Sequence, residues 1–162
     1  MAWRGSTDLK DRFFGAIVYL FAVYDVMALG IGLFTLIPAL LPLFQILQIL
    51  LTPIQLIYGI FNTAIPLGLG SLVVFFILFL AVVRNDKVNY FIRFNTMQSI
   101  LIGIAVSLIQ IIFGTLGGLG IVGGLVFLVV VSVCFYCIVQ CFLGRYPELP
   151  SFSDIVYMYV QR

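Results

Sequence analysis

The chain has 162 residues, of which 64% are hydrophobic and only 9% are charged, and its net charge is +2 at neutral pH. A soluble domain is about half apolar and a quarter charged, so this composition excludes an ordinary soluble protein. No basic run carries interleaved aromatic residues, which argues against nucleic-acid binding. We therefore predict an all-α polytopic membrane protein whose residues 1–162 form a single membrane domain.

The first predicted span covers about residues 13–37 and is long enough to cross a ~30 Å hydrocarbon core. It begins directly after Arg12 and ends before Pro38. Asp25 is the only acidic or basic residue inside the predicted spans. A carboxylate at the bilayer centre costs about 2.5 kcal/mol or more. We therefore treat this intramembrane acid as a candidate functional residue.

Asp25 lies about 20 Å along its helix from the nearest arginine, at a rise of about 1.5 Å per residue. Three serines of the later spans lie at about the same distance from their nearest arginines. They are Ser71, Ser107 and Ser132. The four residues are predicted to form a polar layer across the bundle. The alternative is that each serine bonds its own helix backbone, as serines in membrane helices often do.

The segment between Pro38 and Pro66 is apolar and uncharged, but prolines interrupt it. Its polar and small residues recur at spacings of three and four, which places them on one helical stripe. They are Gln45, Gln48, Thr52, Gln55, Gly59 and Asn62. We expect an amphipathic helix over about residues 43–62. It either lies in the interface with the stripe toward water, or re-enters and lines a polar path with Pro53 as the kink. A plain fifth crossing is disfavoured.

The remaining spans are predicted at about residues 67–83, 94–113 and 120–143, with a glycine-rich turn between the last two. Residues 144–162 are expected to form an ordered tail or a short interfacial helix. The third predicted span carries a stripe of polar and small residues that either packs against neighbouring helices or lines a hydrated passage. The stripe comprises Asn95, Ser99, Gly103, Ser107, Gln110 and Gly114, with Gln98 beside it.

Two G-x-x-x-G pairs flank the turn, Gly114 with Gly118 and Gly120 with Gly124. Such pairs let helix backbones approach closely. We expect them to be packing sites within the bundle first and contacts of a possible homo-oligomer second.

The eight Lys and Arg residues determine the predicted topology. They form three clusters: Arg4, Lys10 and Arg12; Arg84, Lys87 and Arg93; Arg145 and Arg162. Lys and Arg collect in cytoplasmic loops. One helical hairpin between the first and second clusters, and another between the second and third, put all eight Lys and Arg residues on the same side of the membrane. The sequence thus predicts four transmembrane helices with both termini cytoplasmic or stromal.

The chain offers little for catalysis. It has no His, which removes the usual general base and His-based metal sites. Cys134, Cys137 and Cys141 share one helical face and are expected to be buried free thiols, since thiolates are disfavoured in an apolar setting. We expect no enzyme, no metal site and no cofactor.

Short motifs then suggest a family. Val83-Arg84-Asn85 closes the second predicted span, and Arg93-Phe94-Asn95 with Met97-Gln98 opens the third. Further motifs lie at both ends: Arg12-Phe13, Tyr19-Leu20, Asp25, Leu143-Gly144, Pro147, Leu149-Pro150, Ser153-Asp154 and Met158. Together they resemble the twenty-kilodalton subunit family of the translocon at the inner envelope of chloroplasts, which also occurs in cyanobacteria.

Two features depart from that family. Its members often carry Pro where this chain has Ala22, so a kink is not expected there. The short N-terminus has no plastid-targeting extension, which favours a cyanobacterial or plastid-encoded member. The expected membrane is therefore a cyanobacterial membrane, with the plasma membrane favoured, or the plastid inner envelope.

The resemblance implies a membrane subunit that forms or borders a polypeptide-conducting path. Its expected partners are the lipid bilayer, other translocon membrane subunits and unfolded polypeptide in transit. Path-lining candidates are Asn95, Ser99, Ser107 and Gln110, with Gln48 and Gln55 as lesser candidates. The family motif residues are implied to fix the cytoplasmic turn and to contact a partner or anionic headgroups: Arg84, Asn85, Arg93, Phe94, Asn95 and Gln98. The alternative is that the cluster serves only membrane topology, with its long side chains reaching to the interface. The alternatives are a structural or assembly subunit and, third, a small-solute channel.

Overall fold

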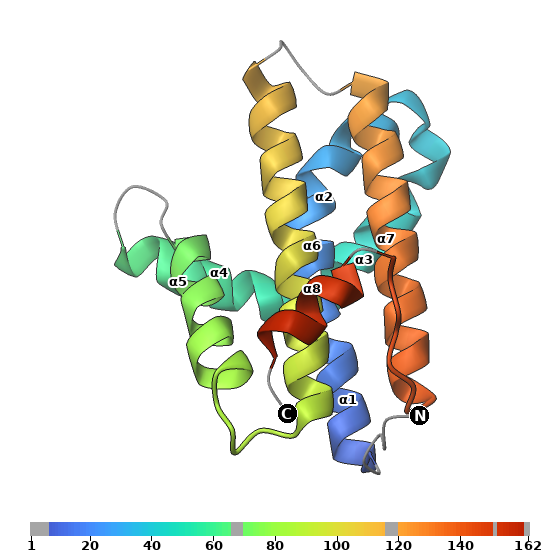
Figure 1. Ribbon diagram of the computed structural model, residues 1–162. Helices are drawn as coiled ribbons and strands as arrows, with labels where there is room; N and C mark the ends of the chain where they lie inside the picture. Colours follow the sequence, from blue (N-terminus) through green and yellow to red (C-terminus); the bar gives the residue numbers. More distant parts are fainter. Residues whose placement is uncertain (1–6, 66–69, 116–119, 151, 161–162) are drawn as a thin grey trace.

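The computed structural model describes residues 7–65, 70–115, 120–150 and 152–160, and these residues form helices joined by turns (Figure 1). The elements in chain order are α1 (Leu9–Ile17), α2 (Tyr19–Leu36), η1 (Pro38–Leu40), α3 (Leu41–Leu50), α4 (Thr52–Ala64), α5 (Gly70–Ile77), η3 (Leu78–Val83), α6 (Tyr90–Thr115), α7 (Gly120–Phe142) and α8 (Phe152–Tyr159). The predicted all-α, multi-pass architecture is confirmed.

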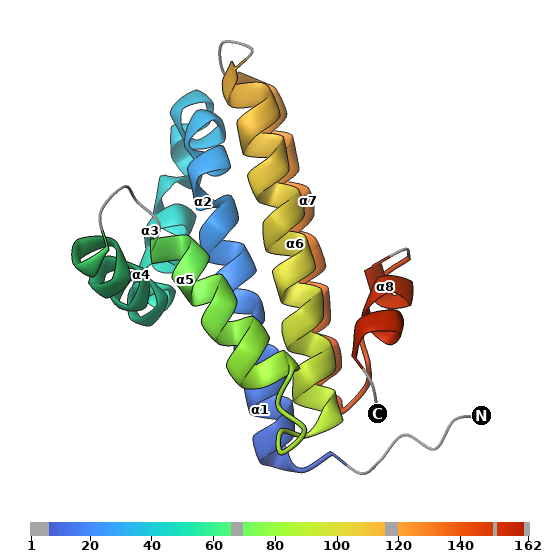
Figure 2. The same ribbon diagram turned by 60° about the vertical axis from the view of Figure 1, so that its left-hand side comes forward.

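Three helices of the described ranges are long and apolar enough to cross a membrane: Leu9–Leu36, Tyr90–Ile112 and Gly120–Phe142. They correspond to the first, third and fourth predicted spans and stand side by side (Figures 1 and 2). Within the first, α1 and α2 are separated at Val18. The helix is therefore interrupted four residues before Ala22, although proline is absent.

A bent helix pair lies between the first and second spans, as the prolines predicted. The chain bends by 63° between Pro38–Leu50 and Thr52–Ala64. Pro53 stands at the start of α4, where its missing N–H removes no helical hydrogen bond. Leu51, at the junction, is fully buried and holds the bend against the bundle. By length and composition the pair is a broken span or a re-entrant loop.

Most of the second predicted span, Gly70–Val83, lies within the described residues. Its described part comprises the eight residues of α5 and the six of η3, and the last six are π-helical. Fourteen residues rise about 21 Å, less than the ~30 Å of a hydrocarbon core. Figure 1 shows that α3, α4 and α5 together bring the chain from the far end of α2 back to the beginning of α6. In the same view α4 runs sideways between α3 and α5. Pro66 and residues 67–69 lie outside the described residues.

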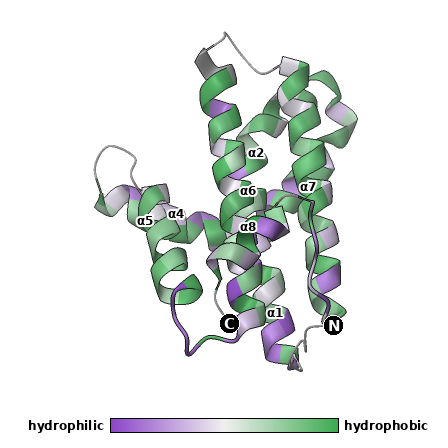
Figure 3. Ribbon diagram, in the orientation of Figure 1, coloured by the Kyte–Doolittle hydropathy of each residue, from purple (hydrophilic) through white to green (hydrophobic). Residues whose placement is uncertain are grey.

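The charged segments meet at one end of the bundle, where hydrophilic residues gather (Figure 3). Asn89, which precedes α6, donates to Asp11 Oδ2 at 2.6 Å. The Arg12 guanidinium lies against Gly144, which follows α7. The described members of the three Lys and Arg clusters therefore share one end, as the one-sided charge pattern requires. Arg4 and Arg162 lie outside the described residues.

A glycine cap ends α7 and reverses the chain. Gly144 has a φ of +70°, the Gly144 N–H donates to Cys141 O, and the Arg145 N–H donates to Gln140 O, which is a Schellman motif. The tail then runs back to α8. Val156 of α8 and Val160, which follows α8, pack in a buried cluster with Phe94. The predicted tail therefore contains a short helix docked on α6.

Close approach between α2 and α7 depends on small residues. A Cβ added at Gly32 would lie 2.7 Å from Gly120 O, and one at Gly124 would lie 2.8 Å from Leu33 Cβ. Gly120 and Gly124 thus lie at a contact inside the bundle. Gly114 is in α6, but its packing is not described, and Gly118 lies outside the described residues.

Candidate functional site

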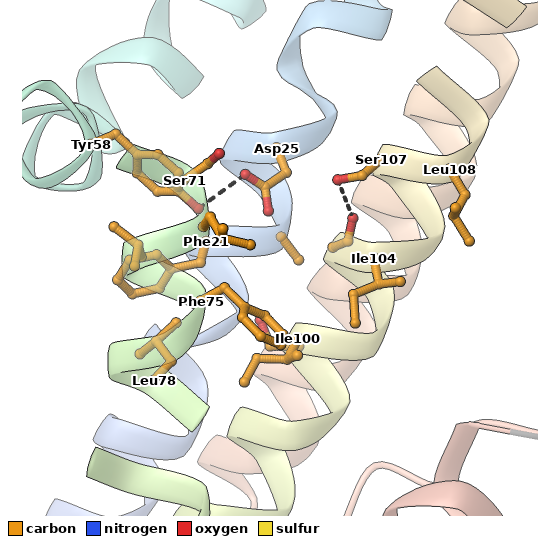
Figure 4. A pocket seen from close by; sticks show the side chains of 15 residues that line it. Phe21, Asp25, Tyr58, Ser71, Phe75, Leu78, Ile100, Ile104, Ser107 and Leu108 are labelled. Atoms are coloured by element: carbon orange, nitrogen blue, oxygen red, sulfur yellow. Dashed lines mark hydrogen bonds between the residues drawn. The ribbon is translucent and has the colours of Figure 1, made fainter. Parts of the chain in front are cut away.

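A pocket of about 300 Å³ opens between α5 and α6, with α2 behind it (Figure 4). Asp25, Ser71 and Ser107 all line it, together with Ser99. Three of the four residues predicted to share one depth are thus brought together. Ser132 is not among them: its side chain is exposed and donates to Leu128 O of its own helix. Ser107 also donates to the backbone of its own helix, at Gly103 O, while lining the pocket.

A second pocket of about 400 Å³ adjoins the first and shares Asp25, Tyr58 and Ser71 with it. We call the two pockets together the polar cleft. The additional polar residues of the second pocket are Gln48, Gln55, Asn62 and Gln110. A third pocket, of about 440 Å³, is lined by Gln45, Gln48, Thr52, Gln55 and Ile49. The polar stripe of the bent pair therefore faces these pockets along most of its length, with only Gly59 outside them.

Asp25 lies where α2, α4 and α6 converge. The Tyr58 hydroxyl donates to Asp25 Oδ1 at 3.1 Å, and Gln110 Nε2 donates to the main-chain oxygen of Asp25 at 2.8 Å. A Cβ on Gly103 would lie 2.9 Å from Asp25 Oδ2, so glycine leaves room for the carboxylate on α6. Two spans, α2 and α6, and the amphipathic helix α4 thus fix the position of this partly buried acid.

Asn95 lies outside the cleft, in the packed half of the bundle. Its Oδ1 accepts from the Tyr19 hydroxyl at 2.9 Å and from Cys141 Sγ at 3.2 Å, and its Nδ2 donates to Phe91 O at 2.7 Å. All three of Tyr19, Asn95 and Cys141 are 0% exposed. Asn95 therefore joins α2, α6 and α7 and lines none of the three pockets described above.

Ser99 contacts both the packed part of the bundle and the polar cleft. Its hydroxyl donates to Val18 O at 2.8 Å, at the interruption between α1 and α2, and its side chain also lines the first pocket. Of the six path-lining candidates, Ser99, Ser107, Gln110, Gln48 and Gln55 border the polar cleft. Their role in conduction stays a prediction.

Comparison with known proteins identifies the family. Residues 8–155 match the family described as "Chloroplast import apparatus Tic20-like". The chain belongs to the Tic20 family. It is 37% identical to a Tic20 family protein of Synechocystis sp., over 99% of both chains. It is 33% identical to the Tic20 family protein Ycf60 of Porphyra purpurea, over 79% of this chain and 74% of that one. It is 27% identical to the chloroplastic protein TIC 20-v of Arabidopsis thaliana, over 92% of this chain and 70% of that one.

Tic20 membership confirms the resemblance drawn from the motifs and makes the chain a translocon-related membrane protein. The family is a translocon component and not an enzyme family. Within the described residues, no group of three or more acidic or Cys side chains could hold a metal. Cys134, Cys137 and Cys141 are free and buried.

The Tic20 motif residues hold the charged end of the bundle together. Arg93, 7% exposed, donates through Nε to Val83 O at 2.9 Å and pairs with Asp86 at 3.2 Å. Arg93 thereby caps the π-helical end of η3 from the first turn of α6. Asn85 orders the same turn, accepting from the Lys87 N–H at 3.0 Å. Arg84 stands exposed at this end of the molecule.

The central Tic20 motif also contacts the tail motif. Gln98, fully buried, donates to Pro147 O at 3.1 Å. Phe94 is fully buried beside Tyr146, with ring centroids 5.2 Å apart. Ser153 accepts from the Leu149 N–H at 2.7 Å and so begins α8. Motifs that are far apart in sequence therefore form one packed unit.

Sequence reasoning missed Tyr58 as part of the site. Its hydroxyl reaches Asp25 from 33 residues away, and its ring centroid lies 4.6 Å from that of Tyr24. One signal was available, since Tyr58 follows Gln55 by three residues and precedes Asn62 by four, on the same helical stripe.

Proposed function

We propose that this chain is a membrane subunit of a protein translocon and that its polar cleft borders the path of an unfolded polypeptide. The observation that carries the proposal is the bent pair, whose uncharged polar side chains line a pocket together with Asp25 and with Gln110 of α6. Tic20 membership supplies the translocon context.

The chemistry of the cleft suits an extended chain. A polypeptide in transit presents unpaired N–H and C=O groups, each costing several kcal/mol in hydrocarbon. Side-chain amides both donate and accept hydrogen bonds without carrying charge. Gln48, Gln55 and Gln110 therefore offer partners to any sequence. A path for varied polypeptides needs this lack of selectivity.

We also propose an orientation of the chain in the membrane. The charged end of the bundle, with the described Lys and Arg residues, would face the cytoplasm or stroma because these residues resist translocation. The membrane would be a cyanobacterial membrane, the plasma membrane first, or the plastid inner envelope. Other translocon membrane subunits would be its partners, and exposed Arg84 is available to them or to anionic headgroups.

A second candidate function is a structural or assembly subunit. It is favoured by the polar side chains that are satisfied inside the bundle, namely the hydrogen-bonded Asn95 and the self-bonded Ser107. In that case the cleft would be filled by a neighbouring subunit and not by polypeptide.

Site-specific photocrosslinking separates these two functions. A photoreactive residue at Ser107 or Gln110 is expected to capture a stalled precursor in native membranes, because both residues border the cleft. Ile111, next in sequence and 65% exposed on the apolar surface, is the matched control and should capture lipid only. Capture of neighbouring membrane subunits alone from Ser107 and Gln110 would contradict a polypeptide path and favour the structural function.

A further inference from the structure

We propose that the polar cleft is a binding site for a primary ammonium group on an aliphatic chain, the chemistry of a lysine side chain. As a site for lysines of a passing polypeptide, the inference rests on the proposed function. Four features of the cleft support it: an unmatched carboxylate, surrounding aromatic rings, neutral oxygen atoms and an apolar wall.

The carboxylate has no cationic partner in the described part of the chain. Asp25 Oδ1 accepts from Tyr58, while Oδ2 faces the space left by Gly103. No Lys or Arg lines either pocket of the cleft. An acid within the membrane is expensive and normally pairs with a cation or marks a pathway. A cation brought by a ligand would supply the missing charge.

Aromatic rings and neutral oxygen atoms complete a site for an ammonium group. The Tyr58 ring centroid lies 4.6 Å from that of Tyr24 and 6.2 Å from that of Phe21. Aromatic faces within about 6 Å attract ammonium groups. The hydroxyl of Ser71 and the amide of Gln55 face the same space and can accept hydrogen bonds.

The other wall of the cleft is apolar and fits the aliphatic part of the ligand. It is formed by Leu72, Val74, Leu78, Ile104 and Leu108. Lysine places its methylene chain on apolar surface and its charge in a polar place. The volume of about 300 Å³ for the first pocket lies at the lower end of the ~300–1,000 Å³ usual for small-ligand sites. A single amine-bearing chain therefore suits it better than a large ligand.

The test compares n-hexylamine with n-hexanol, which has the same chain and no charge. Binding of each to the full chain in lipid nanodiscs is measured by NMR saturation transfer, with empty nanodiscs subtracted for partitioning into lipid. We expect the amine to bind at least tenfold more tightly than the alcohol, and Asp25→Asn to abolish this preference. Equal binding of the two ligands, or an unchanged preference in Asp25→Asn, would overturn the site.

A second variant keeps the test decisive if Asp25→Asn does not fold. In Gly103→Ala the new Cβ would lie 2.9 Å from Asp25 Oδ2 and crowd the carboxylate. Gly59→Ala on α4 is the matched control, since nothing lies within 4 Å of its added Cβ. Gly103→Ala should lose the amine preference and Gly59→Ala should retain it. Retention in both would refute the assignment.

The source of the amine is tested separately. Stalled precursors carry either lysine or acetyl-lysine in the segment captured from Ser107, and capture yields are compared. A higher yield with lysine, lost in Asp25→Asn, supports a polypeptide source. If the chain binds the amine more tightly than the alcohol but captures both precursors equally, a polypeptide is not the source of the amine. Absence of amine preference would overturn the site while leaving polypeptide capture, and so the proposed function, intact.

Discussion

Replacing Asn95 with leucine is expected to lower the free energy of unfolding by about 2 kcal/mol. The substitution leaves the Tyr19 hydroxyl and the Cys141 thiol, both fully buried, without their acceptor. Unpaired buried donors cost about 1–3 kcal/mol, although interhelical bonds inside membranes average nearer 0.6. Unfolding of the purified chain by SDS titration in mixed micelles gives the value.

A double-mutant cycle shows whether the hydrogen bond is the cause. Tyr19→Phe removes the hydroxyl that donates to Asn95. In the Tyr19→Phe background, Asn95→Leu should therefore lower the free energy of unfolding by about 1 kcal/mol less than in the native chain. Ser132→Ala is the matched control, because Ser132 is exposed and bonds only its own helix. It should change stability by no more than about 0.5 kcal/mol. Strictly additive effects of Asn95→Leu and Tyr19→Phe would contradict the proposed role of Asn95.

Enlarging Gly124 should destabilise the bundle to a similar or greater extent. In Gly124→Leu the Cβ alone would lie 2.8 Å from Leu33 Cβ, so α2 and α7 must move apart. Overpacking of this kind costs about 1–3 kcal/mol. The same SDS titration measures it. Val129→Leu, on the exposed side of α7, is the matched control and should be close to neutral.

The Gly124 variant also separates packing from oligomerisation. If the glycine face joins α2 to α7 within one chain, Gly124→Leu lowers the unfolding free energy at any protein concentration. A change in oligomer size by light scattering, with unchanged unfolding, would instead assign this glycine to a contact between copies. The structure favours the first outcome, because Gly124 is buried against Leu33 of the same chain.

Composition and charge placement were enough to predict a multi-pass helical protein, because long uncharged runs between Lys and Arg clusters permit few other arrangements. Counting residues from the charged edges also brought Asp25, Ser71 and Ser107 to one pocket. The spacing of Gln48 and Gln55 predicted a shared face on the bent pair. These successes share a cause: each depends on helix rise and periodicity, which are nearly constant.

Other features could not be read from the sequence. Asn95 and Ser107 lie on one helical stripe, yet the first is packed among helices and the second borders the cleft. Periodicity predicts which residues share a face of a helix, but it does not predict whether another helix or open space lies against that face. The span predicted at 67–83 was drawn from apolar composition alone. Composition does not reveal that α4 runs sideways ahead of α5 (Figure 1). Tyr58 was missed because its partner is distant in sequence.

A cleft that borders the path of an unfolded polypeptide must be open to water and not closed by lipid. Single cysteines at Gln48, Ser107 and Ile111 test this through their rates of reaction with a charged, water-soluble methanethiosulfonate reagent in native membranes. The native cysteines Cys134, Cys137 and Cys141 are 0% exposed and provide the unreactive baseline. We expect Gln48→Cys and Ser107→Cys to react at least tenfold faster than Ile111→Cys. Equally slow reaction at all three positions would contradict a hydrated path through this subunit.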